Sequence, residues 1–259
     1  MKTVAHHGRT TAYRQPAGGS DEPIVYVHGS GGTHQLWVNQ YATNSASRSA
    51  VALDLSGHGK SDPIDTPAGE ATLSAYADDL EAVVNTVDGK YVVGNSLGGA
   101  VVLWSALERN LDVDGLVLCG TGAKLGVADP LKEALTTDLS SATELLHGVD
   151  LLFHDASDDV IAQSRQAMET TGLDVLRRDF LTCDAFDVRD RLDAITTPAL
   201  ALTGVHDQLT PVRFHEYLAE EFPDCELATI DDAAHLSMLE RPDAFASALE
   251  SFFDGLEGQ

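Results

Sequence analysis

Positive charge is scarce in this chain. Only 16 of its 259 residues are Lys or Arg, and five of these are Lys, whereas 41 are Asp or Glu, so the formal net charge is -25. The basic residues are scattered, and none of them form the electropositive stripe that a phosphodiester backbone requires. The composition therefore argues against nucleic acid as a partner.

Long apolar runs and paired cysteines are also missing. No stretch approaches the ~18 uninterrupted apolar residues of a membrane-spanning helix, and the N-terminal "MKTVAHHGRT" lacks the apolar segment of a secretion signal. Cys119, Cys183 and Cys225 are odd in number and widely spaced, which fits neither a disulfide framework nor a metal cluster. We predict a soluble, cytoplasmic protein with no membrane partner.

What the chain does have is enough apolar sequence for one sizeable core, since 43% of its residues are hydrophobic. Short apolar runs alternate with segments of helical period, which predicts βαβ units around a mostly parallel sheet flanked by helices, an α/β fold. The expected strands are residues 23–29, 49–55, 91–96, 114–120, 198–204 and 226–231.

One helix is expected between the second and third of these strands. It begins with Thr72 as its N-cap, and seven apolar residues between 73 and 87 recur at helical spacing on one face. This segment should pack on the sheet.

The strand pattern stops after Gly120 and resumes at Pro198, and the intervening sequence carries helical apolar spacing without a convincing strand. An insertion of this length is typical of a lid, because a separate domain would need its own core. We predict an α/β core from residues 1–122 and 190–259 and a helical cap at residues 123–189.

The stretch "YVVGNSLGGA" places Ser96 between Gly94 and Gly98 in the pattern G-x-S-x-G. An expected strand precedes it and an expected helix follows it, which is the setting of a nucleophile elbow. A phosphate-cradling turn uses similar glycines, but neither G-K-[ST] nor G-x-G-x-x-G occurs here. Ser96 is therefore the candidate nucleophile.

A serine nucleophile needs a base and an acid that orients the base. His235 follows the last expected strand, and Asp207 follows the strand before it, so both should lie at the carboxyl edge of the sheet near Ser96. Taken singly, Asp207 is also typical of an Asx-turn and His235 of a helix start. Asp231 and Asp232 are rival acids that precede His235 too closely to lie on the neighbouring strand tip.

The Gly-rich segment "HGSGG" follows the first long strand and can present backbone N–H groups to an oxyanion. We assign the donors to the backbone N–H groups of Ser30 and of Leu97, the residue after the nucleophile. His28 should hold this loop by hydrogen bonds, and His58 in "DLSGHGKSD" should be architectural.

Taken together, "HGSGG", "DLSGHGKSD", "GNSLGG", "TGVHDQLTP" and "AAHLSMLERPDAF" resemble the α/β-hydrolase superfamily, in its order, from about residue 10 to 255. The resemblance implies an α/β-hydrolase fold, the chain order Ser, Asp, His for the triad, and a cap inserted after the sixth strand.

The details of the resemblance narrow the range of reactions that we expect. A serine at the elbow argues against haloalkane dehalogenases and epoxide hydrolases, which use aspartate there. "GNSLGG" resembles the carbon–carbon bond hydrolases of aromatic degradation, but those usually carry tryptophans after the histidine, where this chain has Leu236 and Ser237. "AAHLSMLERPDAF" and "CDAFDVRDRL" look more like carboxylesterases and 3-oxoadipate enol-lactonases.

The sequence thus predicts a serine hydrolase that cleaves a small-molecule ester or lactone through an acyl-enzyme, with no metal or organic cofactor. The alternatives are an enol-lactonase, a carbon–carbon bond hydrolase, or a ligand-binding protein that has kept the fold without turnover. No feature of the sequence defines an oligomeric state.

The cap should supply the apolar wall of the substrate pocket. The candidate lining residues are Trp37, Leu125, Phe153, Met168, Phe180 and Leu236. A carboxylate-bearing lactone would also need a local cation, for which the candidates are Arg165, Arg177 and Arg178.

The acid excess is spread along the whole chain, as in proteins of salt-accumulating halophiles. The Debye length is about 10 Å at 0.1 M salt and about 3 Å at 1 M, so self-repulsion should be much stronger at low salt. We expect the midpoint of thermal unfolding to fall when molar KCl is dialysed away. An unchanged midpoint between 0.05 and 2 M KCl would contradict the halophilic interpretation.

Overall fold

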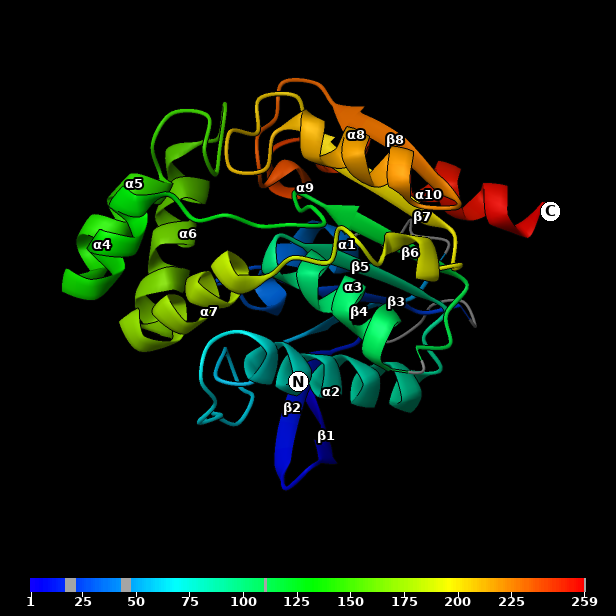
Figure 1. Cartoon of the computed structure of the whole chain (residues 1–259), viewed down its shortest axis with the longest axis horizontal. Helices are drawn as coiled ribbons and strands as arrows, with labels where there is room; N and C mark the ends of the chain where they lie inside the picture. Colours follow the sequence, from blue (N-terminus) through cyan, green and yellow to red (C-terminus); the bar gives the residue numbers. More distant parts are fainter. Residues whose placement is uncertain (17–21, 43–47, 110, 259) are drawn as a thin grey trace.

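The computed structural model describes residues 1–16, 22–42, 48–109 and 111–258. Eight strands form one sheet in the order β1-β2-β4-β3-β5-β6-β7-β8, with helices packed on both faces (Figure 1). The strands from β3 to β8 are mutually parallel, and β2 pairs antiparallel with β4. The predicted α/β architecture is confirmed.

The six expected strands are all present. They are β3 (Ile24–Val27), β4 (Ala50–Leu53), β5 (Tyr91–Asn95), β6 (Gly115–Cys119), β7 (Ala199–Gly204) and β8 (Cys225–Ile230). The first five are buried along their whole length, as expected for parallel strands covered on both faces, whereas β8 at the edge is partly exposed. Their near-continuous apolar sequence is what made them recognisable.

Two further strands, β1 (Lys2–His6) and β2 (Arg9–Arg14), form an antiparallel hairpin that the sequence reading missed. His6 pairs with Arg9, so the loop contains only His7 and Gly8, both at positive φ (46° and 76°). This conformation is that of a type I′ turn, which favours glycine or a polar residue. The His-Gly pair was the available signal, but the strands around it are largely exposed and polar.

The core lies in two layers, one on each face of the sheet. Side chains alternate along β3, so that Val25 and Val27 face one layer whereas Ile24 and Tyr26 face the other. The first layer is covered by α2 (Glu70–Val87), α3 (Leu97–Glu108) and α8 (Val212–Glu221), and the second by α1 (Val38–Ala42) and α10 (Pro242–Glu257). The short elements η1 (His34–Trp37), η2 (Leu192–Ala194) and α9 (Ser237–Glu240) complete the core.

Helix α2 packs its apolar face on the sheet as expected, but Thr72 is not its N-cap. The N-cap is Gly69, three residues earlier, and the Thr72 hydroxyl is buried and donates to the carbonyl of Pro67 at 2.8 Å. The threonine therefore closes the preceding loop onto the helix instead of capping it. No described helix is long and apolar enough to cross a membrane.

Between β6 and β7 the chain forms four helices: α4 (Asp129–Thr137), α5 (Leu139–Leu146), α6 (Asp158–Thr171) and α7 (Leu173–Ala185). They lie together at one end of the sheet (Figure 1). The chain leaves and returns side by side, because Val188 N–H donates to Ala123 O at 2.8 Å and Lys124 forms a bridge with Asp187. We propose that this segment is the cap expected at residues 123–189.

A close backbone approach in the fold occurs at Gly98, in the first turn of α3. A Cβ atom at Gly98 would overlap the carbonyl oxygens of Val27 and His28. Gly98→Ala should therefore lower the free energy of unfolding by about 2 kcal/mol or more, in the range of overpacked cores, as measured by denaturant titration. The control is Gly255→Ala in α10, where nothing lies within 4 Å. A helix-interior alanine should stabilise that site by up to about 1 kcal/mol. Equal effects of the two substitutions would contradict this packing argument.

Candidate active site

Ser96 lies at a sharp turn between β5 and α3. Its backbone is at φ 56° and ψ −118°, a conformation that costs a non-glycine residue about 1–3 kcal/mol and is concentrated at functional sites. The turn is held because Ser96 N–H donates to Cys119 O at 2.9 Å and the Thr121 hydroxyl donates to Ser96 O at 2.9 Å. Gly94 and Gly98 make the turn possible, since a Cβ at Gly94 would overlap the Gly98 backbone.

The structure brings Asp207 and His235 into direct contact. His235 Nδ1 lies 2.8 Å from Asp207 Oδ2, and both side chains are buried. The carboxylate is held from the other side, because the N–H groups of Leu209 and Thr210 each donate to Oδ1 at 2.8 Å. The Thr210 hydroxyl donates to Oδ2 at 2.7 Å. The carboxylate therefore has little freedom to turn away from the imidazole.

Asp207 is kept as a carboxylate by this environment. Burial by itself would raise the pKa of Asp207, but the attraction and hydrogen bond of His235 and the hydrogen bonds of Thr210 outweigh burial and hold the pKa below its usual value. An ionised carboxylate can only accept from Nδ1, so it fixes the tautomer in which Nδ1 carries the proton and Nε2 is free to accept one.

The sequence reading did not identify two residues that support this site. Thr210 contacts both Asp207 and, at 3.3 Å, His235 Nδ1. Asn95 donates to the backbone oxygens of Cys119 at 3.3 Å and His235 at 3.4 Å, which ties the elbow to the histidine loop. The available sequence signals for these two residues were the Thr210-Pro211 pair after Asp207 and the polar Asn95 inside an apolar strand.

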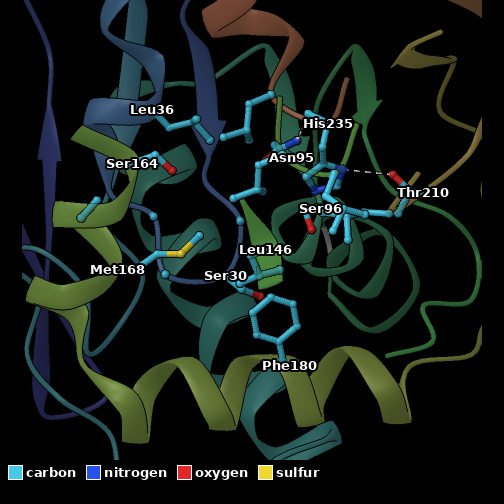
Figure 2. A pocket seen from close by; sticks show the side chains of 18 of the residues that line it. Ser30, Leu36, Asn95, Ser96, Leu146, Ser164, Met168, Phe180, Thr210 and His235 are labelled. Atoms are coloured by element: carbon cyan, nitrogen blue, oxygen red, sulfur yellow. Dashed lines mark hydrogen bonds between the residues drawn. The ribbon is translucent and has the colours of Figure 1, made fainter. Parts of the chain in front are cut away.

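A cavity of about 1090 Å³ opens beside Ser96 and His235, which both line it. Figure 2 shows Asn95, Ser96, His235 and Thr210 gathered on one side, with Leu36, Ser164 and Met168 opposite them. Most of the lining is apolar, and much of it comes from the segment between β6 and β7. A cavity of this size accommodates a drug-sized ligand.

Four of the six residues predicted to form the pocket wall line this cavity: Leu125, Met168, Phe180 and Leu236. Trp37 and Phe153 do not, and the prediction for these two needs correction. Trp37 is fully buried between Tyr26 and Phe245, where its large ring fills the core under η1. Phe153 is nearly buried and packs against His147 within the segment between β6 and β7.

The charge of the lining is unlike that of the chain. The described residues that line the cavity include no Asp or Glu, and their one arginine is Arg213 on α8, stacked over Phe214. Of the arginines considered from sequence, none lines the cavity, and Arg178 instead donates to Ile64 O at 3.0 Å and to Tyr76. The candidate cation is therefore Arg213, which the sequence reading did not consider.

The two proposed oxyanion donors lie at facing backbone segments. Within the part of the chain that the structure describes, neither Ser30 N–H nor Leu97 N–H donates a hydrogen bond. Gly29 packs directly on the elbow, since a Cβ there would lie 3.0 Å from Ser96 Cβ. His28 holds this loop from below, donating from Nδ1 to Gly29 O at 2.8 Å and accepting from Leu55 N–H at Nε2.

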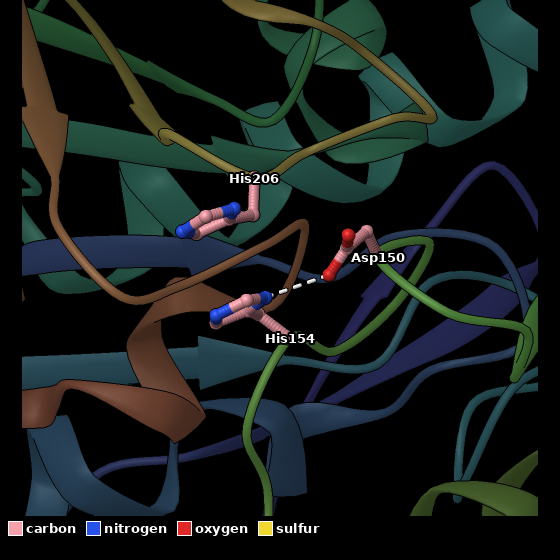
Figure 3. Close-up of side chains that lie close together, drawn as sticks. All are labelled: Asp150, His154 and His206. Carbon is pink, nitrogen blue, oxygen red and sulfur yellow. Dashed lines mark hydrogen bonds and ion pairs between the residues drawn. The ribbon is translucent and has the colours of Figure 1, made fainter.

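One cluster of described side chains could supply metal ligands, namely Asp150, His154 and His206, whose candidate atoms lie within 4.8 Å of one another. Figure 3 shows the two imidazoles stacked face to face, with centroids 3.6 Å apart and planes 3° apart. Asp150 Oδ1 lies 2.6 Å from His154 Nδ1. Because imidazole lone pairs lie in the ring plane, parallel stacked rings do not direct them to one point. Asp150 and His154 therefore form a hydrogen-bonded pair, and the His206 ring stacks on His154.

Comparison with known proteins agrees with the α/β fold described above. The model of the alpha/beta hydrolase family matches residues 24–248. A solved structure of a thermophilic esterase is 31% identical and superposes with a TM-score of 0.86 over 98% of this chain and 97% of that one. A pimeloyl-[acyl-carrier protein] methyl ester esterase of Neisseria meningitidis is 26% identical over 90% of this chain and 94% of its own length. A 3-oxoadipate enol-lactonase of Acinetobacter baylyi is 24% identical over 90% and 89%.

The fold and these matches place the protein among hydrolases built on a mostly parallel sheet. The chain belongs to the alpha/beta hydrolase family, as its motifs predicted.

Two buried histidines support the site from behind and remain neutral. Burial lowers the pKa of His28 to about 4 and that of His215 to about 4. His215 Nε2 accepts the N–H of Thr121, the residue whose hydroxyl holds the elbow. Protonation of either ring would therefore disturb the site as well as place a charge in the core.

The lowered pKa values of His28 and His215 predict how the stability of the fold depends on pH. Between about pH 6.5 and pH 4 the unfolded chain binds protons at these histidines that the folded chain does not, so the free energy of unfolding should fall as pH is lowered through this window. The contribution should be about 3 kcal/mol or less for each histidine. His215→Gln, which can still accept from Thr121, should reduce the slope of unfolding free energy against pH in urea titrations at constant salt. An identical slope in the variant would contradict the neutral assignment.

Proposed function

We propose that this protein is a serine hydrolase that cleaves a carboxylic ester or lactone, with Ser96 as nucleophile, His235 as base and Asp207 as the orienting acid. The observation that carries the proposal is the 2.8 Å contact between His235 Nδ1 and Asp207 Oδ2, with His235 lining the same cavity as the strained Ser96. A buried Asp–His pair beside a serine at positive φ is the arrangement that nucleophilic acyl transfer requires.

In the first half-reaction Ser96 Oγ attacks the carbonyl carbon and His235 Nε2 takes the hydroxyl proton. The carbonyl oxygen becomes an oxyanion, which the N–H groups of Ser30 and Leu97 stabilise. The tetrahedral intermediate expels the alkoxide, which receives the proton from His235 and leaves as an alcohol. The acyl group is then bonded to Ser96.

In the second half-reaction water replaces the alcohol. His235 takes a proton from water, the hydroxide attacks the acyl carbonyl, and Ser96 Oγ departs with the proton from His235 as the acid product is released. Asp207 stabilises the imidazolium in both halves. The sequence of steps needs no metal or organic cofactor.

The cavity supports a particular class of substrate. Its largely apolar lining and volume of about 1090 Å³ support an ester with a sizeable apolar group. An ester and a lactone are cleaved at the same acyl–oxygen bond, and both activities occur in the names of the relatives, a methyl ester esterase and an enol-lactonase. Three free cysteines support a reducing, cytoplasmic location.

The nucleophile is tested by Ser96→Ala. The variant should lose at least about 10³-fold in kcat on p-nitrophenyl esters, because the covalent route is removed, while its thermal midpoint stays at or above that of the wild type. The matched control is Ser164→Ala, which removes another cavity-lining hydroxyl and should retain most of kcat. Full ester hydrolysis by a folded Ser96→Ala variant would sink the assignment.

A panel of esters and lactones in molar salt separates the remaining alternatives. Turnover of short esters alone supports an esterase, and a strong preference for lactones supports a lactonase. Absence of turnover on both, by folded wild-type protein, would contradict the proposal and favour carbon–carbon cleavage or a ligand-binding role.

A further inference from the structure

The loop that should carry one oxyanion donor, residues 29–32, is held by the cap as well as by His28 of the core. The Thr171 hydroxyl, at the end of α6, donates to Gly31 O at 3.2 Å. Asp179 Oδ2, on α7, accepts the Gly31 N–H at 3.4 Å. Both polar groups of the Gly31 backbone are thus bonded to helices of the cap, and none of these contacts comes from the α/β core.

Apolar contacts at the same point reinforce this arrangement. Gly31 is at φ +69°, and a Cβ there would lie 2.7 Å from Leu176 Cδ1 and 3.1 Å from Met168 Cγ. The loop therefore fits against α6 and α7 only because residue 31 has no side chain. Ser30 Oγ lies 3.9 Å from Cys183 Sγ, also on α7.

Asp179 connects this loop to the rest of the molecule. The carboxylate is fully buried, with Oδ1 accepting from Tyr76 Oη of α2 at 2.6 Å and Oδ2 accepting from His58 Nε2 at 2.9 Å. Burial would raise the pKa of Asp179, but the attraction and hydrogen bond of His58 and the hydrogen bond of Tyr76 outweigh it and lower the pKa. The group is a carboxylate and can only accept, which suits it to an N–H, an O–H and an imidazole N–H together.

We propose that Asp179 and Thr171 of the cap are positioning residues that hold in place the loop carrying the oxyanion donor of Ser30. Fixing both backbone groups of Gly31 fixes the peptide planes on either side of it, and the first of these planes contains Ser30 C=O. Ser30 N–H lies in the preceding plane, whose Gly29 carbonyl accepts from His28 Nδ1 at 2.8 Å and Gly32 N–H at 3.1 Å. The cap therefore holds the loop immediately after the donor. This inference rests on the proposed function, since Ser30 N–H matters only if an oxyanion forms.

The consequence is that the cap does more than wall the cavity. When α6 and α7 are in place, Asp179 and Thr171 hold the loop in the orientation that stabilises the tetrahedral intermediate. A loop released from them would still bind substrate, because the apolar lining is unchanged, but would stabilise the transition state less well.

The test compares Asp179→Asn with Asp184→Asn. Asp184 also lies on α7 and also accepts a backbone N–H, that of Val127 at 3.0 Å, but it does not contact the loop. An amide at position 179 cannot accept from all three donors at once, so kcat on a p-nitrophenyl ester should fall about 10- to 100-fold, less than the full loss of a donor. KM should change less than about threefold, and Asp184→Asn should leave kcat within about threefold.

Inhibitors distinguish positioning from loss of stability. A trifluoromethyl ketone, which forms a tetrahedral oxyanion on Ser96, should bind Asp179→Asn more weakly by the same factor as kcat falls, while the product acid binds as in the wild type. Hydrogen exchange should also be faster at Gly31 in this variant. Wild-type kcat and ketone affinity in folded Asp179→Asn would overturn the inference, as would equal weakening of ketone and product.

If Asp179→Asn does not fold, Thr171→Val decides, because it removes the other tether and leaves the buried carboxylate in place. It should lower kcat and ketone affinity together by about 3- to 10-fold, and unchanged values would overturn the inference. If wild-type turnover depends on Ser96 and the variants behave like the wild type, only the positioning role is rejected. Wild-type protein without such turnover rejects the proposed function and this inference together.

Discussion

The structure depends on the close approach of two backbone segments, the first turn of α3 and the end of β3. A Cβ at Gly98 would overlap the carbonyl oxygens of Val27 and His28, and one at Gly29 would lie 3.0 Å from Ser96 Cβ. Without side chains at these contacts, the turn at Ser96 and the Gly-rich loop lie against each other across neighbouring parallel strands. The strain at Ser96 is offset by the buried strands on both sides, because neither can move without opening the sheet.

Asp207 and His235 reach the same place by a different route. They follow β7 and β8, the last two strands of the sheet, and their contact is fixed by short turns at the strand ends. Local hydrogen bonds from Leu209 and Thr210 orient the carboxylate, so its direction is set within four residues of the chain. The loop and the elbow are therefore assembled by the sheet, whereas the acid is oriented by its own turn.

Most of the fold could be predicted because parallel strands that are buried on both faces consist of continuous apolar runs. The β1–β2 hairpin could not, since its strands are short, polar and partly exposed. Of the residues predicted to line the pocket, Leu125 and Met168 line the cavity and Trp37 does not, because apolar character alone does not distinguish a cavity wall from the core behind it. The proposed role of Asp179 depends on contacts with His58, Tyr76 and Gly31. These residues are far from Asp179 in the sequence, so no local sequence pattern predicts the role.

The absence of acidic residues from the described cavity lining has a consequence for how the protein meets its surroundings. The many surface carboxylates are screened by whatever ions the solvent holds, whereas the groups inside the cavity experience mainly their fixed neighbours. The outer charge can therefore be exchanged, residue by residue, as the salinity of the environment changes. The polarity inside the cavity stays as it is, and the two properties can evolve independently.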